Sequence, residues 1–198
     1  MSRLGILGGS FNPPHLGHLA CAEQARRELG LERVALMPVG MPPHKPAGED
    51  PGREHRLTMA ELAVAGHDGL CVSSRELRRP GPSYTVDTLR EIHASDPGAE
   101  LTFIVGGDMA STLPQWREPR AILELARIAV AGRDGLAPEQ VRAALAPLDG
   151  NDRLVFLHMP PLDVSSSQVR ERVAADESIA ELVPGAVADY IHEHGLYR

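Results

Sequence analysis

Residues 8–18 read G-G-S-F-N-P-P-H-L-G-H, and this stretch decides how the chain folds around its first strand. A short apolar run at residues 4–7 precedes it and predicts a buried strand that ends at the two glycines. Beyond Pro13 and Pro14, the spacing of apolar residues becomes that of a helix over residues 16–29. The stretch therefore predicts a strand, a glycine turn and a helix in direct succession.

This turn has the chemistry of an anion-binding site. Glycine lets the backbone approach a ligand closely, and a helix N-terminus gathers unpaired N–H groups and the positive end of the helix dipole. His15 and His18 are three residues apart, which places both imidazoles on one face if the helix has begun by His15. Each feature alone is common in a helix cap, but together they indicate a phosphate site. The stretch is neither a Walker loop nor the dinucleotide fingerprint, because it lacks G-x-x-x-x-G-K-[ST] and G-x-G-x-x-G.

Strand-like and helical segments alternate along the rest of the chain, which is typical of a parallel sheet covered by helices. We therefore expect an α/β fold, a Rossmann-like doubly wound parallel sheet. The 198 residues predict a single domain, with an α/β core over 1–160 and a C-terminal helical appendage over 163–198. The expected strands lie near 3–8, 33–38, 70–73, 101–105, 127–131 and 153–157, and the expected helices at 16–29, 53–65, 84–94, 118–125, 138–145, 165–175 and 178–194.

Composition limits the partners of the protein. Its net charge is −7, whereas general nucleic-acid surfaces carry a basic excess, so we expect no nucleic-acid partner. No apolar run approaches the roughly 20 residues of a membrane span, and we expect a cytoplasmic protein with no membrane association. Cys21 and Cys71 form no C-x-x-C pair, so neither a disulfide framework nor a cysteine zinc site is indicated. Composition leaves open whether the protein is a monomer or a homo-oligomer.

The longest irregular stretch runs from Pro38 to Gly52 and exceeds the length of a plain connection in a compact α/β domain. We interpret it as a substrate loop. It contains His44 and Lys45, and Lys45 is the only lysine among the 20 basic residues. A compact ammonium suits a phosphate group or a mobile loop, although a solvated loop lysine explains the residue equally well.

A second candidate anion site is D-V-S-S-S-Q-V-R at residues 163–170, after the last expected strand. Its serines can cap a helix and present hydroxyls, and Arg170 lies one turn beyond Ser166 and Ser167. Hydroxyls, unpaired N–H groups and a guanidinium can thus converge on one phosphate chain. On these residues alone, an ordinary serine cap beside an exposed arginine is an equally good explanation.

Three features in the middle of the chain bear on nucleotide recognition. Gly106 and Asp108 end a strand-like run at the sheet edge where ligands bind, and Asp108 can accept bonds from ribose hydroxyls or cap a helix. Trp116 is the only tryptophan, and such a residue either packs in a core or stacks on a planar ring. Tyr84 and Thr85 begin another expected helix, whose amides can hold a carboxylate unless the residues simply cap it.

Two of these motifs resemble those of the nucleotidyltransferase superfamily. H-L-G-H at residues 15–18 resembles its H-x-G-H motif, and V-S-S-S-Q-V-R at residues 164–170 resembles its I-S-S-T-x-x-R motif. Val164 replaces isoleucine and Ser167 replaces threonine, so shape or hydroxyl is kept. Members of this superfamily join a nucleotide to a phosphate-bearing acceptor.

Further segments are similar to one branch of the superfamily, the bacterial nicotinate-nucleotide adenylyltransferase family. The chain departs from the family at two positions. Members often have aspartate in place of Asn12 and another small residue in place of Gly107, and neither change alters the expected chemistry. The similar segments include P-P-H-K at 42–45, E-H-R-L-T-M at 54–59, S-Y-T-V-D-T-L at 83–89, F-I-V-G-G-D at 103–108, L-P-Q-W at 113–116 and the tail V-P-x-x-V-x-x-Y-I-x-x-H-G-L-Y at 183–197.

The resemblance implies a reaction and a set of roles. The 5′-phosphate of nicotinic acid mononucleotide would attack the α-phosphate of ATP and give nicotinic acid adenine dinucleotide and pyrophosphate, a step of NAD biosynthesis. Mg²⁺ would bind mainly through the ATP phosphates, with no metal site on the protein. The implied catalytic residues are His15, His18 and Arg170. The implied ATP-binding residues are Gly8, Gly9, Ser10, Phe11, His18, Gly106, Asp108, Ser166, Ser167 and Arg170, and those implied for the mononucleotide are His44, Lys45, Tyr84, Thr85, Asp108 and Trp116.

Two other functions compete with this one. Another H-x-G-H nucleotidyltransferase, such as a phosphopantetheine adenylyltransferase or a cytidylyltransferase, should lack Trp116 and the S-Y-T context. A non-catalytic nucleotide-binding module would have no need for both histidines together with Arg170 and its serines.

Overall fold

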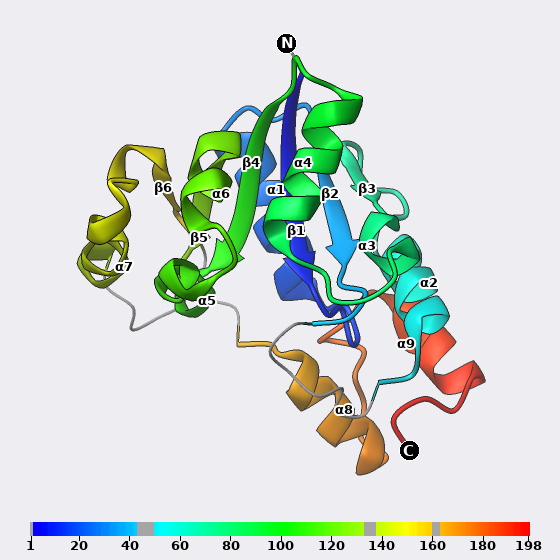
Figure 1. The fold of residues 1–198 in the computed structure, drawn as a ribbon. Coiled ribbons are helices and arrows are strands. Elements are labelled where there is room, and N and C mark those ends of the chain that lie inside the picture. Colours follow the sequence, from blue (N-terminus) through cyan, green and yellow to red (C-terminus); the bar gives the residue numbers. More distant parts are fainter. Residues whose placement is uncertain (1, 43–49, 133–137, 160–162) are drawn as a thin grey trace.

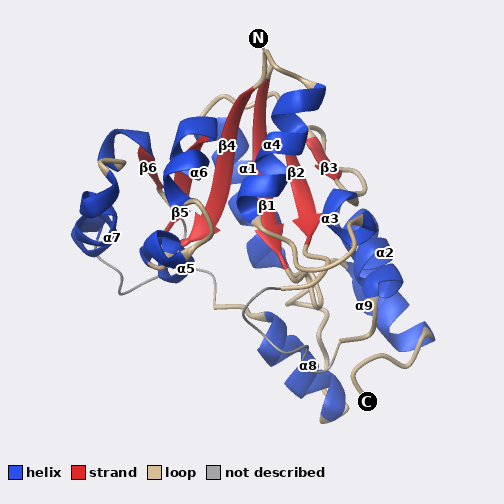
Figure 2. Cartoon of the chain, in the orientation of Figure 1, coloured by secondary structure: helices blue, strands red, loops and turns tan. Residues whose placement is uncertain are grey.

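The computed structural model describes residues 2–42, 50–132, 138–159 and 163–198, which form a six-stranded parallel sheet with helices on both sides (Figures 1 and 2). Its strands are runs of apolar residues, as expected for a parallel sheet that is buried on both faces. They are β1 (Arg3–Gly9), β2 (Arg33–Pro38), β3 (Leu70–Val72), β4 (Glu100–Gly106), β5 (Ala126–Ala131) and β6 (Leu154–Leu157).

Helices connect the successive strands, and two more follow β6. None of the helices in these described ranges is long and apolar enough to cross a membrane. The helices are α1 (Leu16–Glu28), α2 (Arg53–Val64), α3 (Arg75–Arg78), α4 (Thr85–Ser95), α5 (Gly107–Ser111), α6 (Pro119–Leu125), α7 (Pro138–Leu145), α8 (Ser166–Ala174) and α9 (Gly185–Glu193).

The strand order is β3-β2-β1-β4-β5-β6, so the chain builds one half of the sheet and then returns to build the other. The two halves meet where β1 pairs with β4, with Leu7 opposite Ile104. Ligands of doubly wound sheets bind beyond the carboxyl ends of the strands at such a switch point. Gly8 and Gly9, which the sequence placed in a turn, are the last residues of β1, and they lie at this position together with Gly106 at the end of β4.

Two buried clusters cover the two faces of the sheet. One packs α1, α2, α8 and α9 against the sheet, and the other packs α4, α6 and α7. Ile6 and Leu7 are adjacent in β1 but belong to different clusters, because successive side chains of a strand point to opposite faces. In Figure 1, α4 and α6 lie in front of the sheet, α1 lies behind it, and α8 lies below the carboxyl ends of the central strands.

The predicted fold class is confirmed, and every predicted strand matches the structure to within one residue at each end. One predicted helix, at 178–194, is wrong over its first part, because α9 begins only at Gly185. Pro184 precedes α9 in an extended conformation and disfavours helical backbone at Val183. The apolar residues before it, such as Leu182, are buried in turns. The short helices α3 and α5 were not predicted.

Leu36 is fully buried in β2, so Leu36→Ala should lower the free energy of unfolding by about 2–5 kcal/mol, because it removes packed methyl groups and leaves a cavity. Denaturant titration measures this loss. Leu16→Ala is the matched control, since Leu16 is 37% exposed, and it should change stability by less than about 0.5 kcal/mol. Equal losses in the two variants would contradict the position of Leu36 in the core.

Candidate active site

The loop of residues 10–15 joins β1 to α1 at the switch point of the sheet. Phe11 is fully buried and has a left-handed backbone with φ of 47°, which is uncommon for a bulky residue, and the Asn12–Pro13 peptide bond is cis. The N–H of Val39 donates to the carbonyl of Gly9 at 2.9 Å and ties the start of the loop to the neighbouring strand connection. The backbone thus passes directly from the end of β1 into the first turn of α1.

The two histidines of the H-x-G-H motif form a stacked pair. Their ring centroids are 3.7 Å apart with 27° between the ring planes. The backbone N–H of His15 donates to Nδ1 of His18 at 3.1 Å. Since Nδ1 is the acceptor, a neutral His18 carries its proton on Nε2 and can donate from there. The spacing predicted this shared face, although α1 begins one residue after His15, which is its N-cap.

Gly17 makes this pairing sterically feasible. A Cβ at this position would lie 3.0 Å from Nδ1 of His15 and 3.0 Å from Cγ1 of Val164. Contacts this short would displace the imidazole or the segment that leads into α8. The glycine between the two histidines therefore lets the residues before α8 approach the start of α1.

Helix α8 holds the loop from a distant part of the sequence. The hydroxyl of Ser166 donates to the carbonyl of Pro13 at 2.8 Å, and Nη1 of Arg170 donates to the carbonyl of Asn12 at 2.7 Å. Because Ser166 is the first residue of α8, these bonds bring the N-termini of α1 and α8 to the same loop. Both helix dipoles favour an anion there.

The three serines of this segment have different partners. Ser165 is the N-cap of α8 and accepts a bond from the N–H of Gln168 at 3.1 Å. Ser167 accepts a bond from Nη2 of Arg170 at 3.2 Å. The predicted convergence of hydroxyls and guanidinium thus occurs in the structure, with Ser166 turned to the loop carbonyl instead of capping the helix.

Arg56 of α2 also binds the loop, a role that was not predicted from the sequence. It is 2% exposed, its Nη1 donates to the carbonyl of Ser10 at 2.9 Å, and its Nε pairs with Asp50 Oδ1 at 3.1 Å. A signal was present in the sequence, because Arg56 lies on the same helical stripe as the buried Met59 and Ala63. A charged residue on a buried stripe needs a polar partner.

The end of β4 supplies the residues on the other side of the switch point. Gly106 is the N-cap of α5 and Asp108 is the second residue of that helix, with an exposed side chain. The cap role considered for Asp108 is therefore wrong, and its carboxylate points to solvent at the carboxyl edge of the sheet.

Trp116 is half-buried beside the same strand. Its Nε1 donates to Thr112 Oγ1 at 3.0 Å, and its ring meets Phe103 edge-on with centroids 6.1 Å apart. Phe103 also approaches the end of β1, because a Cβ at Gly8 would lie 3.2 Å from its Cζ. Phe103 therefore lies between Gly8 and Trp116, and it was missed because an aromatic residue in an apolar strand is usually a core residue.

Tyr84 and Thr85 begin α4, Tyr84 as the N-cap and Thr85 as the first helical residue. The guanidinium of Arg117 lies over the Tyr84 ring, 4.8 Å from its centroid. In the described ranges, no hydrogen bond or ring contact joins Tyr84 or Thr85 to Trp116 or Asp108. His44 and Lys45 lie outside the described residues.

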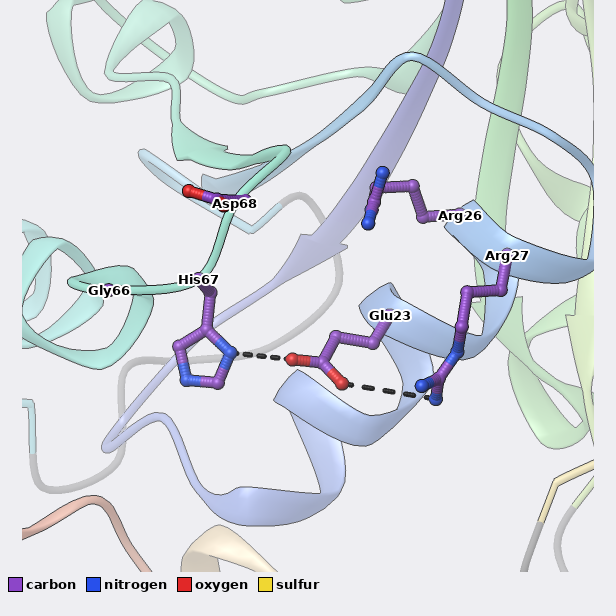
Figure 3. A pocket seen from close by; sticks show the side chains of 6 residues that line it. All are labelled: Glu23, Arg26, Arg27, Gly66, His67 and Asp68. Carbon is purple, nitrogen blue, oxygen red and sulfur yellow. Dashed lines mark hydrogen bonds and ion pairs between the residues drawn. The ribbon is translucent and has the colours of Figure 1, made fainter.

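A cavity of about 260 Å³ lies elsewhere, between the later turns of α1 and the turn that leads into β3 (Figure 3). The carboxylate of Glu23 contacts Nδ1 of His67 at 2.6 Å and Nη2 of Arg27 at 3.9 Å. This cavity opens at the amino ends of β2 and β3, away from the loop, and its charges are partly paired. The lining residues are Glu23, Arg26, Arg27, Gly66, His67 and Asp68.

A doubly wound sheet with stacked H-x-G-H histidines at its switch point defines a nucleotidyltransferase, and the cytidylyltransferase-like family matches residues 6–172. A probable nicotinate-nucleotide adenylyltransferase from Thermomicrobium roseum is 43% identical and aligns with 100% of this chain and 92% of its own length. Another from a Roseiflexus species is 46% identical, over 98% of each chain. The chain belongs to the nicotinate-nucleotide adenylyltransferase family of enzymes.

Solved structures share the fold at lower identity. The nicotinic acid mononucleotide adenylyltransferase of Plasmodium falciparum, complexed with NaAD, has a TM-score of 0.82 and 17% identity over 100% of this chain and 98% of its own. A putative nicotinate-nucleotide adenylyltransferase from Vibrio parahaemolyticus has a TM-score of 0.72 and 18% identity, over 100% and 96%. At this identity they support the α/β architecture.

Gly17→Ala should lower the free energy of unfolding by about 1–3 kcal/mol, because the added Cβ would force the side chains of His15 and Val164 to shift from their packed positions. Gly185→Ala is the matched control at the first position of α9, where nothing lies within 4 Å of an added Cβ. That variant should be neutral or gain about 0.4–1 kcal/mol from the reduced entropy of the unfolded chain. Thermal and denaturant unfolding of both variants measure the difference, and equal stability would refute the packing described here.

Proposed function

We propose that this protein transfers the adenylyl group of ATP to nicotinic acid mononucleotide, giving nicotinic acid adenine dinucleotide and pyrophosphate in NAD biosynthesis. The observation that carries the proposal is the stacked pair of His15 and His18 where the loop of residues 10–15 enters α1, with Arg170 bound to the Asn12 carbonyl of the same loop. Two imidazoles, a guanidinium and two helix N-termini at one loop suit a polyphosphate. The names of the relatives support the choice of acceptor.

The reaction needs no nucleophile from the protein. An oxygen of the mononucleotide 5′-phosphate forms a bond to the α-phosphorus of ATP, and the bond from that phosphorus to the bridging oxygen of the β-phosphate breaks. Pyrophosphate leaves with the electron pair. The protein therefore has to align two polyanions and stabilise the charge that develops between them.

We assign the α-phosphate to His15 and His18, with His18 donating from Nε2. Arg170 uses two of its five N–H donors on Asn12 and Ser167, so it can hold the loop and contact the β- and γ-phosphates together. Ser166 donates its hydroxyl to Pro13, so its backbone N–H, unpaired at the start of α8, suits phosphate better than its hydroxyl does.

The remaining assignments follow the two sides of the switch point. Backbone of Gly8, Gly9, Ser10 and Phe11 would surround the nucleotide, as would Gly106, and Asp108 would accept ribose hydroxyls. Trp116 would stack on the pyridine ring, since its edge-on contact with Phe103 fixes the plane of the indole. Amides at Tyr84 and Thr85 would receive the nicotinate carboxylate, and His44 and Lys45 would approach the mononucleotide phosphate.

Mg²⁺ prefers oxygen ligands and commonly binds through substrate phosphates with one or two carboxylates. Across the described residues, no group of three or more His, Cys, Asp or Glu side chains gathers to form a metal cage. The donors around the loop are imidazoles, hydroxyls and a guanidinium, which suit the phosphates. We therefore expect Mg²⁺ to be held mainly by ATP oxygens, where it would neutralise charge on the departing pyrophosphate.

We further propose that residues 1–198 form a single domain and that the enzyme is cytoplasmic. Val169 of α8 and Ile191 of α9 belong to the same buried cluster as Leu36 of β2, which supports one folding unit. Its substrates are small molecules, and no nucleic acid is needed as a partner.

His18→Ala should lower kcat by about 10²- to 10⁴-fold, because it removes a positioned donor at the reacting phosphate. His18→Gln is a second variant, since glutamine at this helix position can still accept the bond from the backbone of His15. Both should fold, and both should lose activity in a pyrophosphate-release assay. His93→Ala, at an exposed position of α4, is the control and should keep its kcat. Near-normal turnover in both His18 variants would contradict the assignment of His18 to the α-phosphate.

Nicotinic acid mononucleotide should be used about 10- to 100-fold better in kcat/KM than nicotinamide mononucleotide, because amide N–H groups bond a carboxylate more strongly than a neutral amide. Pyrophosphate release from ATP with each acceptor measures this ratio. Parallel reactions with phosphopantetheine test the main competing function. Equal kcat/KM for the two mononucleotides, or faster reaction with phosphopantetheine, would reject the proposed acceptor.

A further inference from the structure

The loop of residues 10–15 is also held by the segment that follows α9. The hydroxyl of Tyr197 donates to Oδ1 of Asn12 at 2.6 Å. Arg56 and Arg170 donate hydrogen bonds to backbone carbonyls of the loop, whereas Tyr197 donates to a side chain. Asn12 is therefore held twice, through its carbonyl by α8 and through its amide oxygen by Tyr197.

A defined turn places Tyr197 at the loop. The N–H of Leu196 donates to the carbonyl of Ile191 at 3.0 Å, and the N–H of Gly195 donates to the carbonyl of His192 at 3.2 Å, which is the Schellman pattern. Gly195 takes the left-handed conformation that this motif requires, with φ of 58°. Leu196 packs against the cluster that contains Ile191. The turn therefore orients the residue that follows it.

The phenol of Tyr197 is suited to act as a permanent donor. Burial raises its pKa far above the ordinary value, and Asp50 adds to this, while Arg170 and Arg56 oppose it. The group therefore stays protonated at neutral pH and can donate to Asn12. Arg170 and Arg56 both bind loop carbonyls, so Tyr197 belongs to the same polar cluster.

We propose that Tyr197 is a positioning residue for adenylyl transfer, which acts through its hydrogen bond to Asn12 and so fixes the loop that carries His15 and leads into the turn of α1 with His18. This inference rests on the proposed function, because the loop is the candidate phosphate site. Tyr197 makes no contact with the reacting atoms in this role. It determines where the loop backbone lies when ATP binds.

Tyr197→Phe tests the proposal, because it removes the hydroxyl and keeps the ring. We expect kcat with ATP and nicotinic acid mononucleotide to fall about 5- to 30-fold, the range for one lost hydrogen bond, with a smaller change in the KM for ATP. Tyr190→Phe is the matched control: its hydroxyl lies 2.9 Å from Nδ1 of His55, which is not a loop residue, and kcat should be unchanged. Equal kcat in the two variants would overturn the proposal.

A double-mutant cycle separates positioning from a general loss of stability. Asn12→Ala should lower kcat, and adding Tyr197→Phe to it should lower kcat no further, because the two residues act through one bond. Independent effects that multiply in the double variant would show that Tyr197 acts elsewhere and would overturn the proposal.

Amide hydrogen exchange on the ligand-free protein provides a readout that does not depend on activity. Exchange at residues 10–12 should be faster in Tyr197→Phe than in the wild type or in Tyr190→Phe. If the wild type fails to turn over ATP and nicotinic acid mononucleotide, the proposed function fails while this experiment still tests the loop. Unchanged exchange at residues 10–12 would overturn the positioning role.

Discussion

The architecture of the site depends on the hydrogen bonds by which α8 holds the carbonyls of Asn12 and Pro13. Buried backbone carbonyls need partners, and a loop that leaves a parallel strand has none within the sheet. Arg170 and Ser166 supply them from 158 and 153 residues further along the chain. Closing such a long loop costs entropy, which burial of Val169 against the sheet cluster helps to offset. The phosphate loop and the C-terminal helices therefore depend on each other for their positions.

Much of this fold could be predicted because its strands are buried on both faces. Each strand is a short apolar run bounded by turn residues, and the runs at β2 and β4 were placed to within one residue. The region before α9 could not be placed in this way. Its apolar residues have helix-like spacing, but Pro184 restricts the backbone, and a period alone does not distinguish a buried turn from a helix.

The residues of the candidate site differ in whether the local sequence around them indicates their role. Short motifs with helical spacing contain His15, His18 and Arg170. Their place near one loop could therefore be predicted from the sequence. Arg56 and Tyr197 act through partners far away in the sequence, and neither has a local pattern that names Ser10 or Asn12 as the partner. Only the contacts that α2 and the segment after α9 make with the loop reveal them.

The position of Phe103 bears on how the choice of acceptor could change within this family. Phe103 lies between Gly8 and Trp116, with the helices that hold the loop packed on one face of the sheet and α4 and α6 on the other. Under the proposed function, the sheet acts as a partition between the machinery that activates ATP and the segments that choose the acceptor. Acceptor choice then depends mainly on α4 and Trp116, and substitutions there can change the acceptor while the adenylyl-transfer loop stays intact.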